Sequence, residues 1–201
     1  MDITDKPALV EAFAKIKEVA GPIDVLVACA GYLSRLQPIA AAENNFDDWW
    51  KGYEINVKGN FNLVTAFFPV AAKNASIIYL STGIVQLPYA PGYSGYATSK
   101  LAATKFFEYV SHEHPELFVL SVHPGVLGTE MSEKAMRDGG PKWPEDGIAL
   151  PADFVNWAVS DEAKFLKGKL VWAHWDVEEL IAMKGEIEGT DKFTLGLLGW
   201  P

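Results

Sequence analysis

The apolar run Ile23-Asp24-Val25-Leu26-Val27-Ala28-Cys29-Ala30-Gly31 carries the clearest structural signal in this chain of 201 residues. It is rich in β-branched residues, follows the helix-breaking pair Gly21-Pro22 and ends at a glycine. Apolar side chains stand at almost every position rather than at every second one, which is typical of a strand buried on both faces of a parallel sheet. We therefore predict a buried parallel strand over residues 23–30.

Helical and apolar segments alternate along the rest of the chain. Helices are predicted where apolar residues recur at helical spacing, over Thr4–Ala20, Phe46–Ala72, Tyr96–His112, Met131–Arg137 and Ala152–Ser160. Further strands are predicted over Ser76–Ser81, Leu117–His123 and Lys169–Ala173. Strands that alternate with helices form parallel βαβ units with right-handed crossovers, which places a mostly parallel sheet between two helix layers. The predicted fold class is therefore α/β, with three α/β/α layers in a single domain over residues 1–201.

The composition restricts the classes of protein and partner. With 49% hydrophobic and 21% charged residues, the chain is typical of a globular domain rather than a disordered one. Its net charge of −9 argues against binding to nucleic acid or to an anionic membrane surface. Cys29 is the only cysteine, which excludes a disulfide within the chain and favours a reducing compartment. The sequence has neither a membrane-spanning apolar run nor the apolar core of a signal peptide at its start, so we expect a cytoplasmic protein.

Residues suited to proton transfer follow the predicted strands, at the edge where parallel sheets bind ligands. They are Ser81-Thr82, Tyr96 with Lys100, and the segment from Pro124-Gly125 to Thr129. Because Tyr96 and Lys100 share one helix face at a spacing of i,i+4, the ammonium can approach the phenol. A nearby cation lowers the pKa of a tyrosine from about 10 and suits it to proton exchange with an alcohol or a carbonyl. The same spacing occurs in many helices as a solvated pair, so spacing alone leaves both interpretations open.

Five motifs that occur in order along the chain favour the catalytic interpretation. They are Asp2-Ile3-Thr4-Asp5, Ala28-Cys29-Ala30-Gly31, Asn56 within Glu54-Ile55-Asn56-Val57-Lys58-Gly59, Tyr96-x-x-x-Lys100, and Pro124-Gly125 through Thr129. Together they resemble the short-chain dehydrogenase/reductase family, in a fungal-type form, over essentially the whole chain. The resemblance implies a Rossmann-like fold and an oxidoreductase that interconverts a carbonyl and an alcohol with NAD(P).

The resemblance also implies roles for single residues. Tyr96 would be the general acid in carbonyl reduction and the base in alcohol oxidation. Lys100 would lower the pKa of Tyr96 and hold the nicotinamide ribose, and Asn56 would fix a water on the proton-relay side. Thr129 would contact the carboxamide of the nicotinamide. The cofactor contacts implied by the motifs as a whole are Asp2, Ile3, Ala30, Gly31, Lys100, Pro124, Gly125, Val126 and Thr129.

Two positions depart from the family pattern. The usual interval before Tyr96 lands on Gly83, which has no side chain, so we expect Thr82 to supply the hydroxyl that holds the same oxygen, with Ser81 as the alternative. Cys29 stands where the family has the second asparagine of an Asn-Asn-Ala-Gly motif. A thiol is a weak substitute for that amide, and we expect Cys29 to act as a small buried hydrophobe.

The motif that binds the pyrophosphate is absent from the sequence. The family begins with a strand, a Thr-Gly-x-x-x-Gly-x-Gly loop and a helix, and Met1 stands where the third strand should just have ended. We therefore expect a fold without the first βαβαβ portion, and weak or lost NAD(P) binding by this chain, because the helix N-terminus that receives the pyrophosphate is missing. The alternative to an oxidoreductase is an atypical member that binds no NAD(P) and acts as a scaffold or as a cofactor-independent catalyst.

The surfaces that we expect to be apolar and exposed indicate a second copy of this chain as a partner. The strand over residues 23–30 would lie at the sheet edge, and with apolar positions on helices 46–72 and 96–112 it predicts a homodimer. His112 and His114 flank Glu113 near a helix end, where positive charge complements the helix dipole, so no metal site is predicted.

Two further segments have expected roles. Residues 126–150 would form a substrate lid, in which Met131, Met136 and Trp143 line a pocket for a small apolar alcohol or ketone. Residues 174–201 would form a natural C-terminal extension that packs back on the domain, with the apolar residues Trp175, Leu197, Leu198 and Trp200.

Overall fold

A computed structural model describes residues 1–41, 43 and 45–197. Its centre is a parallel sheet of β1 (Ile23–Ala28), β2 (Ala71–Leu80), β3 (Phe118–His123) and β4 (Leu170–Trp172), in the spatial order β1-β2-β3-β4. The α/β class and the parallel sheet are therefore confirmed. In a parallel sheet all strands end at the same edge, so the residues that follow β1, β2 and β3 meet there.

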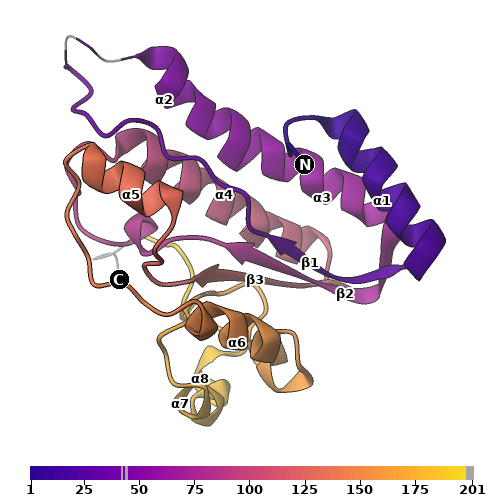
Figure 1. Ribbon diagram of the computed structural model, residues 1–201. Coiled ribbons are helices and arrows are strands. Elements are labelled where there is room, and N and C mark those ends of the chain that lie inside the picture. The colour runs from indigo at the N-terminus through magenta and orange to yellow at the C-terminus, as the bar shows by residue number, and fades with distance from the viewer. Residues whose placement is uncertain (42, 44, 198–201) are drawn as a thin grey trace.

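Helices cover both faces of the sheet (Figure 1). One face carries α1 (Lys6–Ala20), α3 (Asn60–Phe67) and α4 (Ser94–Glu113), with α2 (Phe46–Tyr53) leading into α3. The other face carries α6 (Ala149–Ala158), α7 (Val177–Ala182) and α8 (Lys184–Ile187), while α5 (Glu130–Arg137) lies toward the carboxyl ends of the strands. This arrangement confirms the three-layer, Rossmann-like class.

Alternate residues of the strands divide the core in two. Ile77 and Val119 face α1, α3 and α4, where Phe67 and Phe107 are fully buried. Their neighbours in the sequence face α6, α7 and α8, in a second cluster that contains Ile78, Leu120, Val122, Phe154, Leu166 and Ile187. The two clusters follow from the period of two along a strand, which sends successive side chains to opposite faces.

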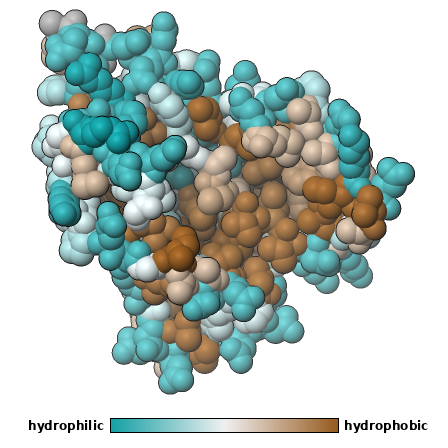
Figure 2. Space-filling model, viewed as in Figure 1, coloured by the Kyte–Doolittle hydropathy of each residue, from teal (hydrophilic) through white to brown (hydrophobic). Residues whose placement is uncertain are grey.

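The prediction that β1 is buried on both faces is wrong for one face. Leu26 and Ala28 are buried, whereas Val25 and Val27 are 40% and 42% exposed. Among the described residues, no helix covers β1 on the side of α6, and Figure 2 shows a broad hydrophobic area over this part of the sheet. The strand also ends at Ala28 rather than at residue 30, because its pairing with β2 ends at the Ala28–Tyr79 pair. As expected, β1 lies at the edge of the described sheet.

The single helix predicted over residues 46–72 is wrong. The structure has α2, a π-helical turn over Glu54–Gly59, α3, and a 3₁₀ turn over Phe68–Val70, after which β2 begins at Ala71. Pro69 lies in the 3₁₀ turn, where its missing N–H ends the helical hydrogen bonding. β2 begins five residues earlier than predicted, and Asn74 adopts a φ of 62° beside the register shift between Ile23 and Val25.

The other predicted helices and strands differ from the prediction by a few residues at their ends, and the short helices α7 and α8 were not predicted. The described part of the C-terminal segment contacts the sheet, because the Leu170 amide donates to the Phe193 carbonyl at 2.8 Å and the ring of Phe193 lies 4.7 Å from that of Trp175. Leu197 is exposed, and Leu198 and Trp200 lie outside the described residues. Within the described part of the chain, no helix is long and apolar enough to cross a membrane.

Candidate active site

Tyr96 lies on the first turns of α4 and faces the carboxyl end of β2. Its side chain is partly buried against Leu33, Leu36 and Tyr93 and shares a hydrogen bond with Thr82. Burial disfavours the charged phenolate and raises the pKa of Tyr96 to about 12, while the hydrogen bond from Thr82 acts in the opposite direction. In this structure Tyr96 is therefore a neutral phenol at physiological pH, with a hydroxyl partner in place.

Lys100, one turn further along α4, is almost fully buried at 3% exposure. Its Nζ donates to the Leu80 carbonyl at 2.6 Å and lies 4.5 Å from the centre of the Tyr79 ring. Burial lowers the pKa of Lys100 to about 7, because a low-dielectric environment disfavours the charged amine. The predicted lowering of the Tyr96 pKa by Lys100 is not among the causes that set this pKa here, and the amine is directed at the Leu80 carbonyl instead.

The two candidate hydroxyl partners point in different directions. Ser81 continues the face of β2 that meets α4, and its Oγ is hydrogen-bonded to Thr104 Oγ1 at 2.7 Å. Thr82 follows the strand and reaches Tyr96 instead. The alternation of side chains at a strand end separates the two residues, and the structure brings only Thr82 to the phenol.

Asn56 is fully buried in the π-helical turn and connects three elements. Its Oδ1 accepts from the Tyr32 amide at 2.7 Å, and its Nδ2 donates to the Tyr32 carbonyl and to Ser99 Oγ, both at 2.9 Å. The Asn60 side chain donates to the Asn56 carbonyl at 2.7 Å. The Asn56 side chain thus holds the loop after β1 against α4, and π-helical turns of this kind are frequent at functional sites.

The predicted cofactor residues near the N-terminus differ in accessibility. The Asp2 carboxylate accepts from both the amide and the hydroxyl of Thr4 at 2.8 Å, and the hydrogen bond from the amide is the largest cause that holds the Asp2 pKa below its usual value. Ile3 is buried in the core against Gly59, where an added Cβ would lie 2.6 Å from the Ile3 side chain. Cys29, Ala30 and Gly31 are exposed just after β1, so the expectation that Cys29 is buried is wrong. The exposed backbone at Ala30 and Gly31 is open to a ligand, whereas the Ile3 side chain is not.

The segment after β3 has a defined backbone path. Gly125 adopts a φ of +93°, which favours glycine. The Val126 amide donates to Asp146 Oδ2 at 2.8 Å, and the Asp146 amide donates to the Val126 carbonyl at 2.7 Å. Thr129 is the N-cap of α5, where its Oγ1 accepts from the Ser132 amide at 3.3 Å. The Thr129 hydroxyl therefore acts as an acceptor at the helix end and still carries a proton to donate.

Four residues that the sequence did not bring together meet beside this segment. His174 Nε2 lies 3.0 Å from Asp146 Oδ2, and the His123 ring lies 6.1 Å from that of His174 and 4.4 Å from that of Trp172. Burial is the main cause that lowers the pKa of His123 to about 4, with the charge of His174 second. His123 ends β3 and His174 follows the adjacent strand β4, which was an available signal, but nothing in the sequence pointed to Asp146. Among the described residues, no group of three His, Cys, Asp or Glu is arranged to hold a metal ion.

A cavity of about 420 Å³ lies between the loop after β1 and α5. This volume falls within the range of small-molecule sites. Its walls are formed by Gly31, Tyr32, Leu33, Glu130, Met131, Glu133, Lys134 and Arg137. Leu33 and Met131 also pack in the cluster that contains Tyr96, which joins the cavity to the phenol.

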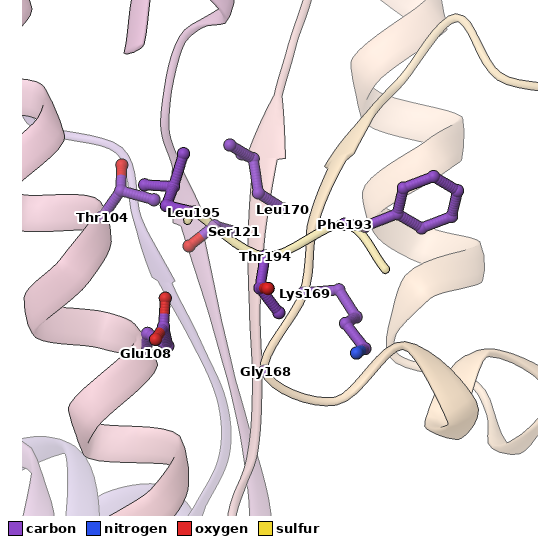
Figure 3. Close-up of a pocket in the computed structure, with 9 residues that line it drawn as sticks. All are labelled: Thr104, Glu108, Ser121, Gly168, Lys169, Leu170, Phe193, Thr194 and Leu195. Carbon is purple, nitrogen blue, oxygen red and sulfur yellow. The ribbon is translucent and has the colours of Figure 1, made fainter. Parts of the chain in front are cut away.

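The residues that line this cavity differ from those predicted to form an apolar pocket. Met131 lines it, but Met136 and Trp143 do not, and both are exposed to solvent. α5 turns its charged residues to the cavity because the helix is amphipathic and its apolar side packs on Leu33 and Leu36. A second cavity, between α4 and the C-terminal segment (Figure 3), has a volume of only about 10 Å³, which is close to that of one water.

Comparisons with known proteins agree with this geometry. The family model described as short chain dehydrogenase matches residues 1–139. The short chain dehydrogenase/reductase AacuD of Aspergillus aculeatus is 35% identical over 98% of this chain and 67% of its own length. A short chain dehydrogenase/reductase of Claviceps purpurea is 33% identical over 94% of this chain and 64% of its own length. The chain therefore spans about two thirds of the length of these relatives.

Solved structures share the fold. A short chain dehydrogenase from Burkholderia cenocepacia, in complex with NADP, has a TM-score of 0.73 at 21% identity and covers 86% of this chain and 72% of its own. An oxidoreductase from E. coli has a TM-score of 0.74 at 21% identity, over 87% of this chain and 72% of its own. The match of the family model to more than half of the residues, together with relatives at 33% and 35% identity, identifies the family. This chain belongs to the short-chain dehydrogenase family.

Proposed function

We propose that this chain carries the proton-transfer centre of an NAD(P)-linked oxidoreductase that reduces a carbonyl to an alcohol. The observation that carries the proposal is that Tyr96 lies beside Thr82 and one helical turn before the buried Lys100, at the carboxyl edge of the sheet. A reduced carbonyl oxygen needs a proton, and the neutral phenol of Tyr96 is the group placed to donate it. The small-molecule substrate would occupy the cavity between Gly31 and α5.

Tyr96 can supply the proton that a carbonyl reduction needs. Its raised pKa of about 12 keeps the phenol protonated at neutral pH. When the proton leaves, the Thr82 hydrogen bond stabilises the phenolate, because a hydrogen bond to the charged form favours that form. Lys100 would add to this stabilisation in its charged form. The charged wall of α5 favours a substrate with polar groups in addition to its carbonyl.

The residues present fit a nicotinamide cofactor in part. The backbone at Gly31 is open, since an added Cβ would meet only Asn56 Oδ1 at 3.7 Å and Met131 Cε at 3.8 Å. Ala30, Gly31, Lys100 and the segment from Pro124 to Thr129 are the groups that would hold the cofactor, which supplies the hydride when it is bound. The sequence has no glycine-rich pyrophosphate loop, and for this reason we propose that the chain by itself binds NAD(P) weakly. The second candidate is a family member that works without NAD(P).

Calorimetric titration of the purified chain with NADH and with NADPH tests the cofactor part of the proposal. Binding too weak to measure at micromolar protein is expected, and micromolar affinity for either nucleotide would contradict it. Turnover is then followed with a panel of aldehydes and ketones at a large excess of NADPH over protein. A detectable rate that persists without any nucleotide would favour the second candidate.

The roles of the hydroxyl groups are tested by isosteric variants. Thr82→Val removes the hydroxyl that contacts Tyr96, whereas Ser81→Ala removes the one that contacts Thr104. We expect Thr82→Val to lower the turnover rate by about tenfold or more, the value of one lost hydrogen bond to a charged group. Equal rates for Thr82→Val and the unmodified chain would exclude Thr82 from the reaction.

A homodimer remains our proposal for the oligomeric state. It is supported by the exposed Val25 and Val27 at the sheet edge and by Phe61, Leu101 and Tyr109, which are exposed on α3 and α4. Small-angle scattering at micromolar concentration should give twice the mass of the chain, and a monomeric mass would contradict the proposal.

A further inference from the structure

The segment between β3 and α6 is closed at its base by one side chain. Asp146 lies 20 residues after Val126, yet the two exchange hydrogen bonds: the Val126 amide donates to Asp146 Oδ2 at 2.8 Å and the Asp146 amide donates to the Val126 carbonyl at 2.7 Å. Leu127 and Asp146 also form an isolated parallel bridge. His174, which follows β4, lies with Nε2 3.0 Å from the same Oδ2. We call these three residues, Val126, Asp146 and His174, the clasp.

The clasp is packed tightly against the backbone that it holds. A Cβ added to Gly125 would lie 2.6 Å from Asp146 Oδ2 and 3.0 Å from His174 Cε1, so no side chain fits at this position. The hydrogen bond from Val126 is the main cause that holds the pKa of Asp146 below its usual value, with the His174 side chain a further cause. At neutral pH the carboxylate is therefore charged; it accepts from the Val126 amide and lies 3.0 Å from His174 Nε2.

A chain of contacts joins the clasp to the hydroxyl beside Tyr96. The ring of Trp172 lies 6.3 Å from that of His174 and 4.4 Å from that of His123. A Cβ added to Gly83 would lie 3.0 Å from Trp172 and 3.2 Å from His123. Gly83 follows Thr82 directly, so the residues beside the clasp also form the wall behind the Thr82 backbone.

We propose that Asp146 and His174 are positioning residues, which close the base of segment 126–146 and so hold Val126 through Thr129 and the α5 wall of the cavity in one arrangement. Neither side chain contacts Tyr96, so their effect on the reaction passes through the backbone that they hold. The effect that we expect these residues to have on turnover rests on the proposed function. The closure itself does not depend on that function.

The test compares four variants of the full chain. His174→Ala removes the side chain that contacts Asp146, whereas His174→Gln keeps an N–H group near the position of Nε2. Asp146→Ala removes the acceptor, and His112→Gln is the matched control at an exposed histidine on α4. The first readout is the exchange rate of the Val126 amide with deuterium. We expect about tenfold faster exchange in His174→Ala and in Asp146→Ala, and a rate within about threefold of the unmodified chain in His174→Gln and in His112→Gln.

A second readout separates positioning from a general loss of stability. The His123 ring can be titrated by NMR, and the charge of His174 lowers its pKa while that of Asp146 raises it. We therefore expect the His123 pKa to rise in His174→Ala and to fall in Asp146→Ala, which a merely less stable fold would not produce. Under the proposed function, both alanine variants raise the KM for the carbonyl substrate more than they lower kcat.

The outcomes are distinguishable. The proposal is wrong if the Val126 amide exchanges at an unchanged rate in His174→Ala. It is also wrong if the His123 pKa shifts in the same direction in both alanine variants. If the unmodified chain shows no turnover, the proposed function fails, while the exchange and titration results still decide whether the clasp closes the segment.

Discussion

Replacing Asn56 with alanine should destabilise the fold more than the same change at any nearby asparagine. The side chain is fully buried and makes three hydrogen bonds of 2.7–2.9 Å, two with the Tyr32 backbone and one with Ser99. Each is worth a net ~0.5–1.5 kcal/mol, so their loss lowers the free energy of unfolding by about 3 kcal/mol. That is a large share of the ~5–15 kcal/mol that stabilises a typical domain.

Asn62 supplies a matched control in the same region of the chain. It is also buried, but its two side-chain hydrogen bonds, to Ile3 and Thr4, are both 3.4 Å long. Bonds of that length are weak, so Asn62→Ala should cost about 1 kcal/mol or less.

Urea unfolding followed by tryptophan fluorescence measures these differences. With a slope of ~1–3 kcal/mol per molar urea, the midpoint for Asn56→Ala should fall by about 1–3 M relative to the unmodified chain. If Asn56→Ala costs no more than Asn62→Ala, the Asn56 hydrogen bonds do not hold the loop after β1 against α4, and the role we assign to this side chain is wrong.

Three further predictions follow from single features of the site. Tyr96→Phe should abolish turnover in whatever carbonyl reduction the chain supports, whereas Tyr109→Phe, an exposed position on the same helix, should leave the rate unchanged. The His123 pKa is lowered from 6.5 to about 4 in the folded chain, so the unfolded state binds more protons as the pH falls through 6.5 toward 4. The free energy of unfolding should therefore fall by up to about 3 kcal/mol over this interval, and urea unfolding at pH 7.5 and 5 should show a smaller difference in His123→Gln. Gly125→Ala should destabilise more than Gly139→Ala in thermal melts: both have a φ near +90° (+93° and +87°), but an added Cβ meets Asp146 only at Gly125. Equal melting temperatures for the two variants would show that the space at Gly125 is unimportant.

The apolar runs and the motif order were sufficient to predict the parallel sheet and the edge on which the site lies. Residues 23–28 pair with Tyr79 and its neighbours as a parallel strand, and Thr82, Tyr96 and Lys100 meet at the carboxyl ends. Such signals depend on neighbours in the sequence, because side-chain periodicity follows from the local backbone geometry. The break of the helix predicted over residues 46–72 was harder to predict, since the π-helical turn at Asn56 is held by Tyr32 and Ser99, which are distant in the sequence.

The sequence by itself determined the α/β class, the family and the identity of the tyrosine that faces the site. Only the tertiary structure decided which hydroxyl reaches Tyr96, where the Lys100 amine points, and that Asp146 meets His174 at the base of segment 126–146. It also decided that one face of β1 is exposed. The physical reason is the same in each case: composition and spacing determine what a segment can form, whereas burial, hydrogen-bond partners and pKa depend on which other segments pack against it.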